Sequence, residues 1–399
     1  MSHFIPADQA EVAEVVTEAV AKHAPLSIIG LGTKSALGRP VRNPCRLDLS
    51  RLDGISFYEP EELVLSALAG TPIATIEALL AASGQELAFE PMSFAALYGT
   101  GHGTIGGSLM ANLSGPRRIK AGAARDFVLG LKAVSGRGKA FKAGGRVVKN
   151  VTGYDLSRGL AGSFGTIAVA TEITLKVLPR AETSATLLLF GLDPGSAIKA
   201  LCAAMGAPAD VSGAAHLPSF PAATQGFENA ITALRVEGFA PSVEGRLALL
   251  ETLLKNFAPM ARLDAPASER LWHAIRDVAP LAEAREKIVW RLSVAPTAGP
   301  KIAEAVGRAY QVEALFDWSG GLVWLALDPC PDGAVVLIRE AIAQNGGGHA
   351  SLIRGPVELR KKIPVFEPQP GALASLSRRL KEAFDPRAIL EPRRMWAEF

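Results

Sequence analysis

The sequence predicts an α+β protein built in two parts, and three observations support this. Its 399 residues exceed the ~100–200 residues of a typical single domain. Up to about residue 180, glycine-rich loops join short apolar strands; beyond it, strands alternate with helices and such loops become sparse. We therefore expect a first domain over residues 1–180, an α+β layer domain over 181–370, and a C-terminal segment over 371–399 that returns to the first domain.

The elements of the first part follow from local patterns. Apolar residues at helical spacing predict a helix over 7–23, followed by a strand over 26–29. A second strand spans 63–69, and Thr71 and Pro72 stand where the N-cap and first residue of a helix over 73–83 belong. Strands over 128–135 and 140–143 form a hairpin, a short helix spans 155–161 and a long strand spans 166–178.

In the second part, predicted strands alternate with predicted helices. Apolar runs predict strands over 187–190, 230–237, 289–294 and 322–327. Amphipathic patterns predict helices over 196–205, 242–254, 300–310 and 334–344. A last helix over 374–384 precedes Asp385 and Pro386.

Composition excludes several classes of function. The net charge of +3 is too small to indicate nucleic-acid or membrane binding. No apolar run approaches the ~18 residues of a membrane span, and the N-terminus lacks the pattern of a signal peptide, so we expect a cytoplasmic protein. Cys45, Cys202 and Cys330 lie far apart and the histidines are isolated, so we expect no iron–sulfur cluster and no metal site.

The charge is unevenly distributed. Between Arg117 and Lys149 stand ten Lys or Arg residues and a single acid, Asp126. A solvated basic face is the ordinary explanation of such a run. Phosphate neutralisation and docking of an acidic partner are the alternatives.

The glycine loops carry the functional signal. Gly101–Gly106 matches the dinucleotide pattern G-x-G-x-x-G, but no good strand precedes it and no long helix follows, so a Rossmann site is not expected. Gly30–Lys34 follows a strand, and its backbone N–H groups can converge on an anion. Two further loops, 104–107 and 162–167, lie up to about 140 residues away, which suits an extended ligand lying across a domain.

These loops, in this order, resemble the FAD-binding domain of the vanillyl-alcohol oxidase/PCMH flavoprotein family. Further segments, over nearly the whole chain, resemble the family of glycolate oxidase E subunits; the most specific is the block from Lys149 to Pro179. The segments that carry the resemblance are Tyr58–Leu63, Ala69–Pro72, Gly84-Gln85, Phe89–Pro91, Ser114–Arg118, Arg125–Gly130, Gly144–Arg158, Gly162–Pro179, Trp290–Ser293, Asp317-Trp318, Trp324-Leu325, Gly347–Ala350, Phe384–Pro386, Pro392 and Met395.

The resemblance implies a PCMH-type, two-part FAD-binding domain, an α+β cap domain over the isoalloxazine ring, and a returning C-terminal segment. The backbone of Gly30, Leu31, Gly32, Thr33 and Lys34 would hold the FAD pyrophosphate. The other residues expected beside FAD are Pro91, Thr104, Ile105, Gly106, Gly107, Asn112, Gly115, Arg117, Asn150, Gly162, Ser163, Gly165, Thr166, Ile167 and Val169.

Three departures from the family pattern bear on chemistry. Relatives that bind FAD covalently have a histidine where this chain has Lys34 or Ser35, so we expect a non-covalent flavin. Catalytic 2-hydroxy-acid dehydrogenases of the family carry a paired-histidine metal motif, which this sequence lacks. The usual glycine or asparagine is replaced at four positions, which are Ala168, Ser319, Glu391 and Arg393.

The implied function is that of the FAD subunit of a glycolate oxidase (glycolate dehydrogenase) complex. Such a complex is an FAD-dependent oxidoreductase that oxidises the CH–OH group of glycolate, a small 2-hydroxy acid, to glyoxylate. The implied partners are a D-like flavoprotein subunit and an F-like iron–sulfur subunit that receives the electrons. The complex is also the route by which a cytoplasmic chain would associate peripherally with a membrane.

Two other functions remain open at this point. A stand-alone FAD oxidase of another small hydroxy acid or alcohol would turn over alone and have a polar pocket at the domain interface. A non-catalytic FAD-binding scaffold or electron-transfer subunit would have its flavin face blocked by cap residues such as Trp318.

The catalytic residues are less well defined than the cofactor loops. His349 could act as an acid or base, and Arg291 or Arg354 could bind a substrate carboxylate through two hydrogen bonds. Tyr154 could donate a hydrogen bond to substrate or flavin. Each also has an ordinary structural explanation: a loop histidine, interface ion pairs and a packed tyrosine.

Overall fold

The computed structural model describes residues 2–41, 45–147 and 154–398, and the first ten strands in it form three small sheets. The three-stranded sheet is parallel, in the order β1 (Ser2–Phe4), β3 (Cys45–Asp48) and β2 (Leu26–Ile29). The helix α1 (Gln9–Lys22) begins after Asp8, whose side chain accepts from the N–H of Glu11, and it buries Val12 and Val16.

The five-stranded sheet is antiparallel and lies beside the parallel one. Its order is β4 (Ile55–Glu59), β5 (Val64–Leu68), β9 (Ala168–Lys176), β7 (Val128–Ser135) and β8 (Ala140–Gly144). The short strands β6 (Gln85–Glu86) and β10 (Leu178–Pro179) pair separately. The helices of this region are α2 (Ile73–Ala82), α3 (Ala95–Tyr98), α4 (Ile105–Ala111), α5 (Arg118–Ala121), α6 (Ala124–Phe127) and α7 (Leu156–Leu160).

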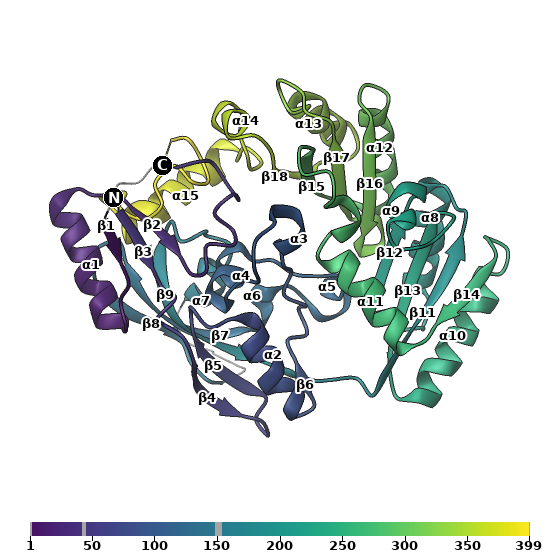
Figure 1. Ribbon diagram of the computed structural model, residues 1–399, viewed down its shortest axis with the longest axis horizontal. Coiled ribbons are helices and arrows are strands. Elements are labelled where there is room, and N and C mark those ends of the chain that lie inside the picture. The colour runs from purple at the N-terminus through teal and green to yellow at the C-terminus, as the bar shows by residue number, and fades with distance from the viewer. Residues whose placement is uncertain (1, 42–44, 148–153, 399) are drawn as a thin grey trace.

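The remaining strands form one antiparallel sheet of eight (Figure 1). Its order is β14 (Met260–Leu263), β11 (Thr183–Phe190), β13 (Ile231–Gly238), β12 (Gly213–Leu217), β16 (Val312–Asp317), β17 (Leu322–Leu327), β15 (Ile288–Val294) and β18 (Gly348–Arg354). The α-helices that accompany it are α8 (Pro194–Gly206), α9 (Ser219–Ala223), α10 (Ala240–Leu254), α11 (Ala265–Arg276), α12 (Gly299–Gly307), α13 (Val335–Gln344) and α14 (Val357–Lys362). Three short 3-10 helices complete it, η1 (Ala279–Leu281), η2 (Pro296–Ala298) and η3 (Trp318–Gly320).

The two faces of the eight-stranded sheet pack against different partners. One face forms a core with α8, α10, α12 and α13. The other face packs against α11, η1 and apolar residues of the N-terminal region, among them Leu37, Phe94 and Leu97. The N-terminal region and the eight-stranded sheet therefore share one apolar core.

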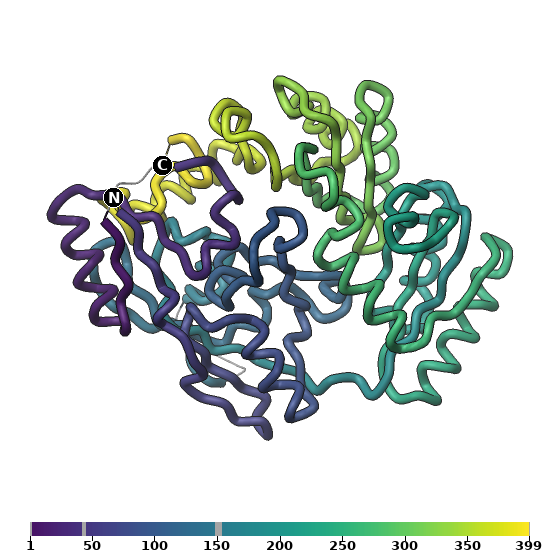
Figure 2. Tube along the Cα trace, in the orientation of Figure 1, coloured from purple at the N-terminus to yellow at the C-terminus, as the bar shows by residue number. Residues whose placement is uncertain are grey.

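The C-terminal segment runs back to the parallel sheet (Figure 2). Helix α15 (Gly371–Phe384) leads into it, and Leu390 forms a parallel bridge with Leu26 of β2. The Lys381 ammonium is buried and donates to the carbonyls of Thr166 and Leu390 and to the Asp385 carboxylate. These contacts fix the last described residues beside β2.

The expected α+β class is confirmed, with two local corrections. Thr71 does not cap α2, because its hydroxyl donates to the Leu68 carbonyl and accepts from the N–H of Gly54, and Pro72 occupies the N-cap position. His349 lies in the edge strand β18 and not in a loop.

Candidate FAD-binding site

The loop after β2 forms one wall of a cavity. Gly32 has a φ of 69°, a left-handed conformation that glycine adopts without strain, and the Ser35 N–H donates to its carbonyl at 3.2 Å. Thr104 lies opposite as the N-cap of α4, with its hydroxyl accepting from the N–H of Gly107 at 3.2 Å. A Cβ on Gly30 would stand 2.8 Å from that hydroxyl oxygen, so only glycine fits there.

Two adjoining cavities lie between the parallel sheet and α4. The first has a volume of about 90 Å³ and is lined by Gly30–Ser35, Thr104, Gly107, Met110, Phe164 and Arg394. The second, of about 70 Å³, shares Gly30, Thr104, Gly107, Met110 and Phe164 and extends to Gly165 and Val169. Together they form a continuous path from the Gly30 loop to the start of β9.

The charged groups at this path are cationic. Lys34 is half-buried, and burial lowers the pKa of its ammonium group to about 8. Among the described residues no carboxylate pairs with it. Arg394 enters from the C-terminal segment, donating to the Lys34 carbonyl at 3.0 Å and to Glu391 at 3.1 Å.

This arrangement fits the pyrophosphate of FAD. A binding site for an anion needs cationic groups and N–H donors, and a backbone that the anion can approach closely. Lys34 supplies a charge that no carboxylate of the described residues neutralises, and a Cβ at Gly103 would stand 2.5 Å from its ammonium nitrogen, so the glycine-lined wall leaves room for the group. The Nε of Arg394 is also buried and has no hydrogen-bond partner within the described part of the chain.

The structure brings together many of the residues that the sequence placed beside FAD. Those lining the two cavities are Gly30, Leu31, Gly32, Thr33, Lys34, Thr104, Gly106, Gly107, Gly165 and Val169. Ile105 is buried beneath them in α4, and Gly162 adjoins α4 through its N–H, which donates to the Leu109 carbonyl.

Other expected residues have structural contacts of their own. The Asn112 side chain accepts from the N–H of Arg125, and the Gly115 carbonyl accepts from the Trp318 indole. The Ser163 hydroxyl contacts the Met110 sulfur, the Thr166 hydroxyl donates to the Ser163 carbonyl, and Ile167 packs under β7. Asn150 lies outside the described residues.

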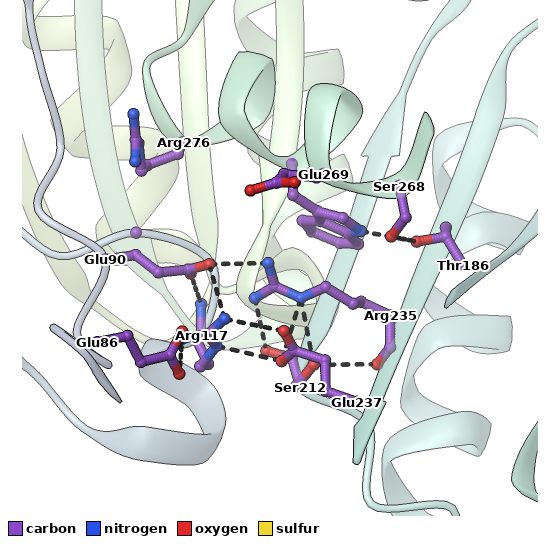
Figure 3. A network of polar contacts seen from close by, with 12 residues as sticks. Glu86, Glu90, Arg117, Thr186, Ser212, Arg235, Glu237, Ser268, Glu269 and Arg276 are labelled. Carbon is purple, nitrogen blue, oxygen red and sulfur yellow. Dashed lines mark hydrogen bonds and ion pairs between the residues drawn. The ribbon is translucent and has the colours of Figure 1, made fainter. Parts of the chain in front are cut away.

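Pro91 and Arg117 line a different cavity, of about 530 Å³, between α2, β13 and α11. Figure 3 shows the ion-pair network at its edge. Arg117 pairs with Glu86 at 2.6 Å and with Glu237 of β13 at 2.8 Å. Arg235 pairs with Glu90 at 2.7 Å. Arg117 therefore links the N-terminal region to the eight-stranded sheet, and its guanidinium does not face the FAD path.

The four catalytic candidates do not converge. Tyr154 is 91% exposed and His349 is exposed. Arg354 donates its five N–H groups to five carbonyl oxygens, those of Leu97, Leu281, Ala282, Ala284 and Lys287, which leaves it no donor for a substrate. Arg291 is half-buried beside Trp318 and Trp324.

Three residues that were not named individually from the sequence also line the two cavities. Arg394 comes from the tail, and Met110 and Phe164 contribute the apolar wall. Phe164 belongs to the glycine loop 162–167, which was expected beside FAD. Nothing near Arg394 in the sequence connects it to Lys34.

The described residues contain no group of three or more His, Cys, Asp or Glu side chains that could hold a metal ion. They also contain no helix with the length and apolar character needed to span a membrane.

Comparison with known proteins agrees with this geometry. A family model described as an FAD binding domain matches residues 3–144. The glycolate oxidase subunit GlcE of Escherichia coli (strain K12) is 34% identical over 385 residues, which cover 96% of each chain. The glycolate oxidase subunit GlcD of Bacillus subtilis (strain 168) is 30% identical over 184 residues, covering 46% of this chain and 38% of GlcD.

Solved structures show the same fold. Substrate-bound p-cresol methylhydroxylase superposes with a TM-score of 0.74 and 12% identity, covering 98% of this chain and 88% of that enzyme. The expected PCMH-type architecture is therefore confirmed, and FAD is the cofactor that the matched family binds.

Proposed function

Because this chain belongs to the glycolate oxidase E-subunit family of PCMH-type FAD flavoproteins, we propose that it is the FAD-binding subunit of a complex that oxidises glycolate to glyoxylate. The similarity over almost the whole of both chains carries this proposal. The cationic, glycine-walled path supports it, because it suits the pyrophosphate of FAD.

Within this proposal, the residues of the chain bind and orient the cofactor. The backbone of Gly30–Lys34 and the side chains of Lys34 and Arg394 would hold the pyrophosphate, and Met110 and Phe164 would pack against its apolar parts. When bound, FAD supplies the hydride acceptor for oxidation of an alcohol. The flavin would be non-covalent, since none of the residues lining the two cavities is His, Cys or Tyr.

We also propose the domain limits 1–180 and 181–370, with residues 371–399 returning to the first domain. Strands β1 to β10 share no sheet with β11 to β18 among the described residues, and Leu390 bridges to Leu26, which supports these limits.

The partners proposed are a D-like flavoprotein subunit and an F-like iron–sulfur subunit that accepts the electrons. The word subunit in the name of the E. coli relative and the partial similarity to GlcD support an assembly of related chains.

A reconstitution experiment tests this function. The chain is co-expressed with D-like and F-like subunits, and glyoxylate formation from glycolate is measured with an artificial electron acceptor. We expect activity and co-purification only when this chain is present. Equal activity without it would contradict the proposal, and rapid glycolate-dependent bleaching of the isolated, FAD-loaded chain would favour a stand-alone oxidase.

A further inference from the structure

Two arginines from opposite sides of the domain junction pack on one tryptophan ring. The guanidinium carbon of Arg118, the first residue of α5, lies 4.4 Å from the ring centroid of Trp318. The guanidinium carbon of Arg291, in β15, lies 5.1 Å from the ring centroid of Trp318. It also lies 5.9 Å from the ring centroid of Trp324, which pairs with Arg291 from the adjacent strand β17. The Trp318 indole N–H donates to the Gly115 carbonyl at 3.1 Å, which fixes the ring at the junction.

These two half-buried arginines differ from the buried arginines in having no oxygen partner among the described residues. Arg235 pairs with Glu90, Arg354 donates to five carbonyls, and Arg360 donates to the carbonyls of Ala36 and Gly38. Within residues 2–41, 45–147 and 154–398, neither Arg118 nor Arg291 forms an ion pair or a side-chain hydrogen bond. Their interactions are those with the indole rings.

The electrostatics of the pair favour an anion. Burial, and then the charge of Arg118, lower the pKa of Arg291 to about 10. The carboxyl group of Asp317 acts electrostatically on Arg291, but it is too far away to form an ion pair with it. Burial raises the pKa of this carboxyl group to about 7. Two cationic groups on one ring, with no ion-pair partner among the described residues, are costly to bury, and a bound anion lowers that cost.

The chemistry of the pair specifies the kind of anion. Guanidinium groups bind planar carboxylates through two parallel hydrogen bonds. Both residues are half-buried. Gly115, which holds Trp318, stands in the loop after α4, and the first turn of α4 lines the FAD path.

We propose that Arg118 and Arg291, stacked on Trp318, form a subsite that binds the carboxylate of a small 2-hydroxy acid. The substrate class rests on the proposed function, whereas the anion site rests on the unpaired arginines themselves. The subsite would select a hydroxy acid over an uncharged alcohol of the same size.

The test is calorimetric titration of the FAD-loaded chain with oxalate, a small dicarboxylate, and with oxamide, its uncharged counterpart. We expect oxalate to bind and oxamide not to bind. Arg291→Gln and Arg118→Gln should each weaken oxalate binding about 10- to 100-fold, as expected for loss of a charge-assisted hydrogen-bond pair. Arg291→Lys should bind oxalate more tightly than Arg291→Gln but more weakly than wild type. Lysine keeps the positive charge, but it cannot form the two parallel hydrogen bonds of a guanidinium group.

Arg308→Gln is the matched control, since Arg308 is exposed on the surface after α12 and pairs with Glu304. It should leave oxalate binding unchanged.

Flavin content and thermal unfolding are measured for each variant, and Arg118→Gln decides the matter if Arg291→Gln does not fold. An FAD-loaded wild-type chain that binds no oxalate, or a folded Arg118→Gln variant that binds it as tightly as wild type, would overturn the subsite. Oxalate binding that persists when the reconstituted complex fails to oxidise glycolate would instead overturn the proposed function alone.

Discussion

Lys34 shows how one residue sets the charge of the candidate cofactor site. It lines the first cavity and presents a cation to it. Burial lowers the pKa of its ammonium group to about 8, because no carboxylate of the described chain compensates the charge. A pyrophosphate anion would supply that compensation.

This gives a pH dependence for FAD binding. In the free protein Lys34 is charged below about pH 8 and loses its proton above it, whereas a bound anion keeps it charged. The dissociation constant of FAD, measured by flavin fluorescence, should be constant below pH 8 and rise by up to about tenfold per pH unit above it.

Lys34→Gln should bind FAD about 10- to 100-fold more weakly at pH 7 and lose this rise. Lys34→Arg should retain the affinity through pH 9. A wild-type dissociation constant that stays flat from pH 7 to 10 would exclude Lys34 as a pyrophosphate contact.

Single residues also show what the sequence could predict. The family resemblance marked Ala168, Ser319, Glu391 and Arg393 as replacements of the usual glycine or asparagine, and the last three have positive φ angles, of 60°, 41° and 63°. Glycine and asparagine tolerate this conformation best, which accounts for these three positions but not for Ala168, which lies in β9. The sequence could show the replacement but not the backbone angle that makes it costly.

At the scale of elements, the sequence predicted the structures that depend on neighbouring residues. It did not predict contacts between residues far apart in the chain. The strand over 26–29, its glycine turn and the helix after Pro72 depend on neighbouring residues, and the structure confirms them. The Thr71 cap was wrong because Gly54, 17 residues earlier, engages the hydroxyl. The pairing of the Arg117 guanidinium with Glu237, 120 residues later, has no signal in the sequence around Arg117.

The C-terminal segment should depend on one buried ion pair. Lys381 and Asp385 are both buried, and the Asp385 carboxylate also accepts from the N–H groups of Ile389 and Leu390. Asp385→Asn would leave the buried ammonium without its counter-charge, so we expect a loss of about 3 kcal/mol in the free energy of unfolding, measured by urea denaturation.

FAD affinity should fall in the same variant, because Arg394 belongs to this segment. Glu382→Gln, an exposed change in the same helix turn, is the control and should alter neither quantity. If Asp385→Asn weakened stability but left FAD affinity intact, the segment would be a structural anchor without a role at the cofactor.

At the scale of the whole molecule, the N-terminal region and the eight-stranded sheet are joined by two kinds of contact. The apolar core places Phe94 of the former 6.4 Å from Trp324 of the latter, between ring centroids. The ion-pair network of Figure 3 adds Glu90, whose carboxylate accepts from the N–H of Arg117 and from the Arg235 guanidinium. We expect the two regions to unfold together.

Glu90 should make the free energy of unfolding depend on pH in acid, because it joins the N-terminal region to the eight-stranded sheet. Burial alone would raise the pKa of its carboxyl group, but Arg235 and Arg117 outweigh burial and lower it to about 2. A carboxylate with a lowered pKa stabilises the folded state above its ordinary pKa of 4.5, and the contribution is lost as the pH falls from there toward 2.

Glu90→Gln should therefore cost about 3 kcal/mol of unfolding free energy at pH 7 and make stability less steep between pH 4.5 and 2. Glu62→Gln, an exposed change in the N-terminal region, is the matched control. Denaturant titrations across this pH range measure both effects, and equal acid sensitivity of wild type and Glu90→Gln would refute the assignment.

The contact between Arg394 and the Lys34 carbonyl joins residues 360 positions apart, and this separation has a consequence for biosynthesis. A ribosome that has translated the Gly30 loop must still add almost the whole chain before Arg394 exists, and the exit tunnel must then release it. During translation the emerging polypeptide lacks Arg394, one of the two cations proposed to hold the pyrophosphate. Flavin loading is therefore expected after synthesis, so a cell starved of riboflavin would accumulate finished, flavin-free chains and not stalled ones.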